Sequence, residues 1–100
     1  MTALQRRFRK IVQRLGEPYV SGGDTRTGIF APMSSGFAGT YLTSAELGAA
    51  ARPIRVAYVA FDDPTLEGAA LTWNGYTLTV KRAIQVRFRG TTVARMLVLV

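Results

Sequence analysis

The side chains that most enzymes use for catalysis are nearly absent from this sequence. The chain has 100 residues and contains neither histidine nor cysteine. It therefore lacks the most common general base and metal ligand, and it cannot form disulfides, thiolate nucleophiles or cysteine-bound metal sites. The remaining carboxylates and hydroxyls have no recognisable catalytic partner in the sequence. We expect no enzymatic activity and predict no catalytic residue, no cofactor and no metal.

Asp62 and Asp63 form an adjacent acidic pair, with Glu67 close by. Hard cations such as Ca²⁺ take six or more oxygen ligands, so three carboxylates at this spacing are a weak metal signal. Aspartate commonly opens a turn, and here the pair precedes Pro64. We therefore interpret the stretch DDPTLEG as the turn that ends a strand.

Two glycine-rich stretches resemble phosphate-binding loops in their glycine content alone. They are Ser21 to Asp24, with the sequence SGGD, and 36–39, with the sequence GFAG. Both lack the strand-to-helix setting and the lysine that a phosphate-binding loop requires. We assign neither of them to a ligand.

Basic and aromatic residues alternate in the last quarter of the chain. Such a pattern is found on the binding face of nucleic-acid-binding barrels. Tyr76 and Phe88, however, fall on the strand parity that we expect to face the core, where their rings would be unavailable for stacking. A solvated basic face is the favoured interpretation, and nucleic-acid binding remains an alternative. The basic residues of this pattern are Lys81, Arg82, Arg87, Arg89 and Arg95.

The positive charge is concentrated at the N-terminus. Thirteen Lys and Arg against six Asp and Glu give a net charge of +7. The first fifteen residues contain no acid, and their cations are Arg6, Arg7, Arg9, Lys10 and Arg14. A surface of this kind attracts acidic partners, whether phosphate or protein, although it can also be simply solvated.

The same N-terminal segment has the pattern of an amphipathic helix. Leu4, Phe8, Ile11, Val12 and Leu15 recur at intervals of three and four residues, which places them on one side and most of the cations on the other. Thr2 and Gln5 fit a capping box, and Gly16 suits the position just past the helix. We predict a helix over residues 1–16 whose apolar side docks on the domain.

The clearest strand signal is LTWNGYTLTV, from Leu71 to Val80. Asn74-Gly75 fits a two-residue type I′ turn, which would place Trp73 opposite Tyr76 and Leu71 opposite Leu78. All four side chains then lie on one face, so the turn and the apolar pattern specify the same register. We predict a β-hairpin here.

The second strand of this hairpin continues to Phe88, with Tyr76, Leu78, Val80, Ile84, Val86 and Phe88 on one parity as a core face. A strand this long bends in a small barrel, and we expect a bulge or a crossing between sheets at Arg82-Ala83. A II′ turn at Gly90-Thr91 would pair Val93 with Phe88 and Leu97 with Ile84. The last strand, VARMLVLV, is apolar on both parities and must be covered, with the N-terminal helix as candidate.

The middle of the chain is predicted to be mostly loop. A short extended stretch, Tyr19 to Ser21, is followed by turn residues, a strand from Thr25 to Ala31, and then residues 33–53 without sustained periodicity. A short helix around Ser44 to Ala50, capped by Ser44, fits within them. The loop carries Phe37, Tyr41 and Leu42, which must pack either on their own domain or, as we favour, on a neighbouring subunit.

These elements make a single mainly β domain. We predict a small antiparallel barrel or sandwich of five or six strands, preceded by the N-terminal helix over 1–16, interrupted by the long loop over 33–53 and completed by the hairpin-rich half over 54–100. A strand over Ile54 to Phe61, covered on both faces over part of its length, opens that half. No apolar run reaches the ~20 residues of a membrane-spanning helix. The charged N-terminus does not look like a signal peptide, so we expect a cytoplasmic origin.

The order of these features resembles the head-completion, or stopper, proteins and related head-tail joining proteins of long-tailed bacteriophages. The residues that carry the resemblance are the helix LQRRFRKIVQRLGEP, the strand TGIFAP followed by the long loop, and the C-terminal half from LEGAALTWNGYTLTV to RFRGTTVARMLVLV. The chain departs from the family pattern at Gly68-Ala69, where the family often has a glycine followed by an acidic residue.

The resemblance implies a structural virion protein of the phage neck, made in the host cytoplasm. It would form a homo-oligomeric ring between the portal or adaptor and the tail, and close the channel for packaged DNA, which it would approach without sequence specificity and without a membrane. On this basis the channel-gating or subunit-contact candidates are Ser34, Ser35, Phe37, Tyr41 and Leu42, and the basic partner- or DNA-facing candidates are Arg6, Arg7, Lys10, Arg87 and Arg89. A tail-terminator or other neck protein, and a nucleic-acid-binding small β-barrel, are the alternatives.

Overall fold

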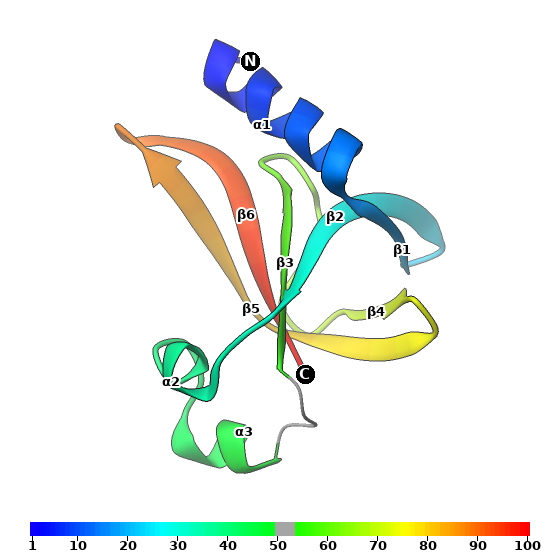
Figure 1. Ribbon diagram of the computed structural model, residues 1–100, viewed down its shortest axis with the longest axis vertical. Helices are drawn as coiled ribbons and strands as arrows, with labels where there is room; N and C mark the ends of the chain where they lie inside the picture. Colours follow the sequence, from blue (N-terminus) through cyan, green and yellow to red (C-terminus); the bar gives the residue numbers. More distant parts are fainter. Residues whose placement is uncertain (50–53) are drawn as a thin grey trace.

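Six antiparallel strands close into a barrel in the computed structural model, which describes residues 1–49 and 54–100 (Figure 1). The strand order around the barrel is β1-β2-β3-β6-β5-β4. The elements are α1 (Ala3–Leu15), β1 (Glu17–Ser21), β2 (Asp24–Pro32), α2 (Ser35–Ala38), α3 (Ser44–Ala49), β3 (Arg55–Ala60), β4 (Ala70–Trp73), β5 (Tyr76–Phe88) and β6 (Thr91–Leu99). The predicted fold class, a small antiparallel barrel with an N-terminal helix, is confirmed.

The helix α1 begins and ends where its capping residues predict. The Thr2 hydroxyl accepts from the Gln5 backbone at 3.1 Å, and the Gln5 side chain accepts from the Thr2 backbone at 2.9 Å, which completes the capping box. Gly16 follows the helix as predicted, and its backbone is extended. A Cβ at Gly16 would lie 2.4 Å from the Val12 carbonyl oxygen, so close packing requires the glycine.

The β4–β5 hairpin has the predicted turn and register. Asn74 and Gly75 have φ of 49° and 81°, as a type I′ turn demands, and Trp73 pairs with Tyr76 and Leu71 with Leu78. An analogous turn at Gly22-Gly23, with φ of 60° and 82°, joins β1 to β2. The turn-rich stretch SGGDTRTG is therefore mostly strand, because two glycines suffice for the reversal and β2 begins at Asp24.

Two apolar clusters lie on opposite sides of the strands. The interior cluster draws side chains from all six strands, namely Tyr19, Phe30, Ala57, Val59, Leu71, Trp73, Leu78, Val80, Ala83, Leu97 and Leu99. The outer cluster combines strand residues with residues of the β2–β3 connection, and consists of Ala31, Met33, Ala38, Tyr41, Leu42, Leu47, Ile54, Val56, Ile84, Val86, Met96, Val98 and Val100. In β3 and β6 successive residues alternate between the clusters, as pleating requires. Both faces of these two strands are thus covered.

The long strand β5 changes face at a bulge. Its pairing with β6 shifts between Val80 and Arg82, adjoining the predicted site at Arg82-Ala83. Because β5 has one extra residue at the bulge, its even-numbered residues face the interior before the bulge and the outside after it. Val80 therefore points into the barrel, whereas Ile84 lies in the outer cluster. The predicted core face was therefore right for Leu78 and Val80 and wrong for Ile84, Val86 and Phe88, which follow the bulge.

The β5–β6 turn lies one residue earlier than predicted. Arg89 and Gly90 occupy the turn with φ of 52° and 78°, so that Phe88 pairs with Thr91 rather than Val93. A second register shift follows between Val86 and Arg87, and Leu97 pairs with Ala83 rather than Ile84. The register of the whole hairpin depends on which residues form the turn, and arginine in the left-handed region is not a local turn signal.

The β2–β3 connection contains two short helices: α3 matches the short helix that we placed around Ser44, whereas α2 lies where we expected loop. α3 is capped by Thr43 rather than Ser44, since the Thr43 hydroxyl accepts from the Glu46 backbone and the Glu46 carboxylate accepts from the Thr43 backbone. The rest of the predicted loop, residues 50–53, and with it the predicted helix end at Ala50, lie outside the described residues. We call residues 33–49 the insertion. It covers part of the outer face of β3 and β6. α1, our candidate for covering the last strand, also packs against β6, as well as against β2 and β3.

Candidate functional site

The fold brings the two predicted basic groups to one end of the molecule. Figure 1 shows α1 and the β5–β6 turn at the same end, with α2 and α3 at the other. The contact is specific, because the Gln5 side chain donates to the Thr92 carbonyl at 2.9 Å and Thr92 pairs with Arg87. The side chains of Arg6, Arg7, Lys10, Arg87 and Arg89 are all exposed, and none forms an ion pair within the described parts of the chain.

The tip of the β5–β6 hairpin exposes an aromatic ring between two arginines. Phe88 is 54% exposed, and the Arg89 guanidinium lies 5.4 Å from its ring centroid. Arg87 donates to the Gln85 side chain at 3.0 Å. Phe88 was predicted to be a core residue, but it follows the bulge in β5, shares the outward parity of Ile84 and Val86, and pairs with Thr91 beside the turn. The tip combines charge with an accessible π-face, as nucleic-acid-binding surfaces do.

Tyr76 is also exposed, contrary to our prediction, and belongs to a second aromatic group at the β4–β5 hairpin. Its ring stacks on Trp73 with centroids 6.0 Å apart, and Trp73 stacks on Phe30 at 4.5 Å. The Arg55 guanidinium lies 4.5 Å from the Tyr76 centroid. Twelve residue steps of β5 separate Tyr76 from Phe88, roughly 40 Å of strand. The two exposed rings therefore cannot form one binding platform.

The gating or subunit-contact candidates have different positions in the insertion. Leu42 is 5% exposed and packs on its own barrel in the outer cluster, together with the half-buried Tyr41. Phe37 is 47% exposed and meets Tyr41 edge to face, with centroids 5.4 Å apart. Leu42 therefore anchors the insertion within the monomer, and Phe37 is the large apolar group that remains available to a partner.

The serine candidates lie at the start of α2. The Ser34 side chain accepts from the Phe37 backbone at 3.2 Å and its carbonyl accepts from Ala38 at 2.8 Å, so Ser34 caps the helix. Ser35 is the first residue of α2. The role of Ser34 in this structure is to orient Phe37.

A salt bridge fastens the insertion to the barrel. Arg82, at the β5 bulge, donates to both oxygens of Glu46 in α3, at 2.8 Å and 3.2 Å. The pKa of Glu46 is lowered, chiefly because the Thr43 backbone N–H donates to its carboxylate, with Arg82 contributing further. Sequence reasoning missed this pair, although Thr43 and Glu46 have the spacing of a capping box.

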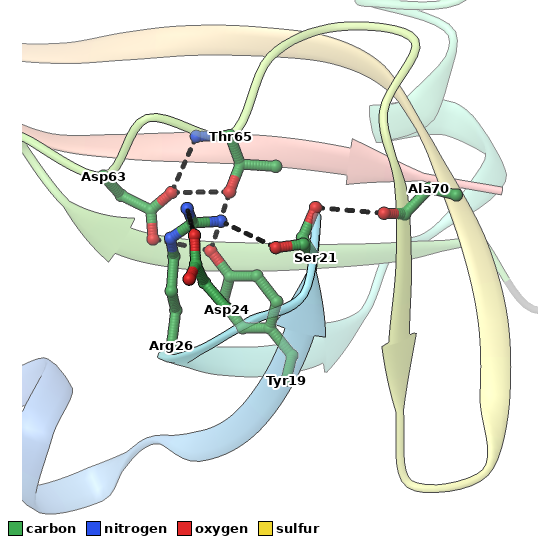
Figure 2. Close-up of polar contacts among 7 residues, drawn as sticks. All are labelled: Tyr19, Ser21, Asp24, Arg26, Asp63, Thr65 and Ala70. Carbon is green, nitrogen blue, oxygen red and sulfur yellow. Dashed lines mark hydrogen bonds and ion pairs between the residues drawn. The ribbon is translucent and has the colours of Figure 1, made fainter.

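The most buried polar group joins the β3–β4 connection to β1 (Figure 2). The Tyr19 hydroxyl donates to Asp63 at 2.5 Å and lies 3.0 Å from the Thr65 hydroxyl, which itself donates to Asp63 at 2.6 Å. Arg26 donates to Asp24 at 3.1 Å beside them. Burial and the bond to Asp63 raise the pKa of Tyr19 far above its ordinary value. A tyrosine held protonated in this way stabilises the fold and cannot act as a base at neutral pH.

A cleft of about 440 Å³ opens between α1 and the β3–β4 connection, and its lining includes Arg9, Gln13, Thr27 and Asp62. Arg9 is ion-paired with Asp62, which leaves little unsatisfied charge in the cleft. The described residues contain no group of three side chains with the ligand types for a metal ion. Asp62 and Asp63 begin the turn after β3 and serve as structural partners, as our turn interpretation expected.

Within the described residues, no helix has the length and apolar character needed to span a membrane. The chain matches no protein-family model, no curated protein and no solved structure. The function must therefore be argued from the barrel, the insertion and the basic end.

Proposed function

We propose that this chain is a structural subunit of the neck of a long-tailed bacteriophage, forming a head-completion or stopper ring between the portal or adaptor and the tail. The observation that carries the proposal is a rigid closed barrel with a helical insertion at one end and a basic surface at the other. The sequence resemblance implied a ring-forming protein whose long loop, residues 33–53, closes the channel. The protein has a mechanical role and catalyses no reaction.

The barrel supplies rigid walls for packing between subunits. Its six strands follow a closed order, with β1 and β4 joined at Val20 and Thr72, and beyond Val80 strand β5 pairs with β6 on one side. Contacts between two different surfaces of the same chain generate rings when the rotation closes. The exposed side chains at the two ends provide such different surfaces.

The insertion supplies the surface that faces the channel or the next subunit. Leu42 and the Arg82–Glu46 salt bridge hold its base to the barrel, so we no longer assign Leu42 or Tyr41 to the contact surface. Phe37 on α2 contacts Tyr41 with its ring edge to face and remains 47% exposed, with the small residues Gly36 and Gly39 nearby in the sequence. A ring of Phe37 side chains would narrow a channel without large rearrangement of the barrel.

The basic end supplies attraction for DNA or for an acidic neighbouring ring. Arg6, Arg7, Lys10, Arg87 and Arg89 lie at one end and are not neutralised within the described chain. Positive charge of this kind binds polyanions without sequence preference and in a salt-dependent manner.

The decisive experiment is a reconstruction of the assembled particle from a virus that encodes this chain. We expect a ring of barrels in the neck, and we expect particles from a gene-deleted virus to lose DNA or to lack tails. A Phe37→Ser virus should lose DNA while its neck still assembles, with Thr40→Ser in the same insertion as control. Infectious, leak-free particles made without this protein would contradict the proposal.

A nucleic-acid-binding barrel is the second candidate, and one observation favours it. Tyr76 and Phe88, whose rings we had expected to be buried, are exposed with an arginine guanidinium beside each. Because the two rings are far apart along β5, the Phe88 tip with its adjoining basic residues is the more suitable site for DNA.

The two candidates differ in what isolated protein should do with DNA. If DNA binding is the function, affinity should fall steeply with salt and decrease at least tenfold in Arg87→Glu/Arg89→Glu. Arg6→Glu/Arg7→Glu changes the net charge equally at the α1 part of the basic end, so comparing the two variants shows whether binding depends on the tip in particular. Equal losses in both variants would indicate a general charge effect, and background binding in the wild type would remove this candidate.

A further inference from the structure

The buried residue of α1 and two polar residues bonded to the barrel lie on one line along the helix, beside the line formed by the other apolar residues. Gln5 donates to the Thr92 carbonyl, Arg9 pairs with Asp62, and Val12 is buried. These three positions follow one another at intervals of four and three residues and so lie along one side of the helix. Two of the three are polar, and their bonds fix the rotation of the helix about its axis.

The apolar line is turned sideways as a result. Each remaining apolar residue lies one position before a contact residue or, for Leu15, before the next position along the contact line. One position is a rotation of 100° on a helix. These residues are Leu4, Phe8, Ile11 and Leu15. Leu4 and Phe8 are half-buried, but Ile11 is 39% exposed and Leu15 is 68% exposed. We call Ile11 and Leu15, with the adjoining edges of Leu4 and Phe8, the apolar flank of α1.

The apolar flank is bordered by positive charge. Arg7 lies one turn before Ile11 and Arg14 lies almost one turn after it, so both guanidinium groups can reach over the same strip of surface. Both arginines are exposed, neither has an ion pair among the described residues, and α1 contains no acid. An apolar strip beside unneutralised arginines suits an amphipathic segment with acidic margins.

We propose that the apolar flank of α1 is a docking site for an acidic amphipathic helix of another protein. The partner's leucine-type side chains would cover Ile11 and Leu15, and its carboxylates would face Arg7 and Arg14. The inference depends on the geometry of α1 alone and holds whether or not the chain belongs to a phage neck.

A second copy of this chain is a poor occupant. Its α1 carries five cations, so two such helices would repel each other across the contact. Its α2 carries no acid, and the single acid of α3, Glu46, is already bonded to Arg82. Within the described residues, this chain therefore offers no acidic amphipathic helix, and the partner must be a different protein.

The test uses a fluorescently labelled synthetic peptide with leucines at helical spacing and glutamates at the other positions. Anisotropy titration of the full chain should show saturable binding, and Ile11→Ser/Leu15→Ser should weaken it at least tenfold. Arg7→Glu/Arg14→Glu should weaken it comparably. Both pairs are exposed, so thermal unfolding followed by circular dichroism should show that the variants remain folded.

The matched control is Val20→Ser/Leu66→Ser, which removes two other exposed apolar side chains, and it should bind the peptide as the wild type does. Three results would overturn the proposal. They are absence of binding to the wild type, equal binding of a peptide with the same composition in scrambled order, and equal loss of affinity in the control pair. A version of the peptide with lysine in place of glutamate should not bind.

A membrane surface would use the same chemistry and is separated in a parallel experiment. Vesicles of phosphatidylcholine with phosphatidylserine are sedimented with each variant. Vesicle binding that depends on Ile11 and Leu15, without binding of the acidic peptide, would replace the protein partner with an anionic membrane and overturn the proposal as stated.

Discussion

The Arg82 guanidinium and the Glu46 carboxylate form a two-point contact, with nitrogen–oxygen distances of 2.8 Å and 3.2 Å. Arg82 follows the bulge in β5, and Glu46 lies in the first turn of α3. The bulge thus has two effects. It reverses the face of β5, and it presents an arginine that holds the insertion against the barrel.

Glu46→Gln should loosen the insertion while leaving the barrel intact. It removes the charge that Arg82 and the Thr43 backbone bind, although an amide can still accept a hydrogen bond. We expect faster hydrogen exchange of the α3 amides, measured by mass spectrometry, with unchanged exchange in β3 and β6. Glu17→Gln, at an exposed position, is the matched control. Unchanged protection of α3 would show that the salt bridge does not hold the insertion.

Truncation of Leu42 should lower the stability of the fold much more than truncation of Phe37. Leu42→Ala removes a buried side chain from the outer cluster and should lower the free energy of unfolding by about 2–4 kcal/mol. Phe37→Ala should lower it by less than about 1 kcal/mol, since the ring is half exposed. Urea denaturation of both variants measures this. A larger loss of stability for Phe37 than for Leu42 would mean that the division into anchor and contact residue is reversed.

Gly16 and Gly48 should respond differently to alanine. At Gly16 the added Cβ would lie 2.4 Å from the Val12 carbonyl oxygen and 2.7 Å from the Thr27 methyl carbon, so Gly16→Ala should cost about 1–3 kcal/mol. Gly48 lies in α3 with open space around it, so Gly48→Ala should raise the free energy of unfolding by about 0.5–1 kcal/mol. Thermal unfolding of the two variants tests both signs at once.

The Asn74-Gly75 and Arg89-Gly90 turns permit an exchange of residues. Arg89 has a φ of 52° at the position where the other turn has Asn74 with a φ of 49°. Because asparagine tolerates this conformation better, Arg89→Asn should stabilise the protein by up to about 1 kcal/mol, and Asn74→Arg should destabilise it by a similar amount. Chemical denaturation measures both. If Arg89→Asn is stabilising yet impairs assembly or DNA binding, the arginine is retained for function rather than for folding.

Tyr19 should make the protein sensitive to alkali. Folding raises the pKa of Tyr19. The stability that its protonated hydroxyl contributes is therefore fully present below the ordinary tyrosine pKa of about 10, and it is lost as the pH rises from there through the higher pKa of the folded state. Tyr19→Phe should cost about 1–3 kcal/mol at neutral pH, because Asp63 loses a donor. The difference from wild type should shrink above about pH 10. Tyr58→Phe, at an exposed position, should show neither effect.

Features set by neighbouring residues could be predicted from the sequence. The capping box of α1 and the Asn74-Gly75 hairpin with its register depend on contacts within a few positions, and both are observed as predicted. The bulge near Arg82 was also foreseen, since a long strand in a small barrel must bend. The sequence by itself therefore determined the fold class and the local geometry of these elements.

Tertiary contacts alone decided which of these surfaces are buried. One extra residue in β5 sends Ile84 to the outer face, and the Arg89-Gly90 turn brings Phe88 into solvent. Bonds from Gln5 to β6 and from Arg9 to the β3–β4 connection rotate α1 and expose Leu15. The physical reason is common to all three. A shift of one residue or of one helix position reverses which side chains face the core, and the contacts that select the shift lie far along the chain.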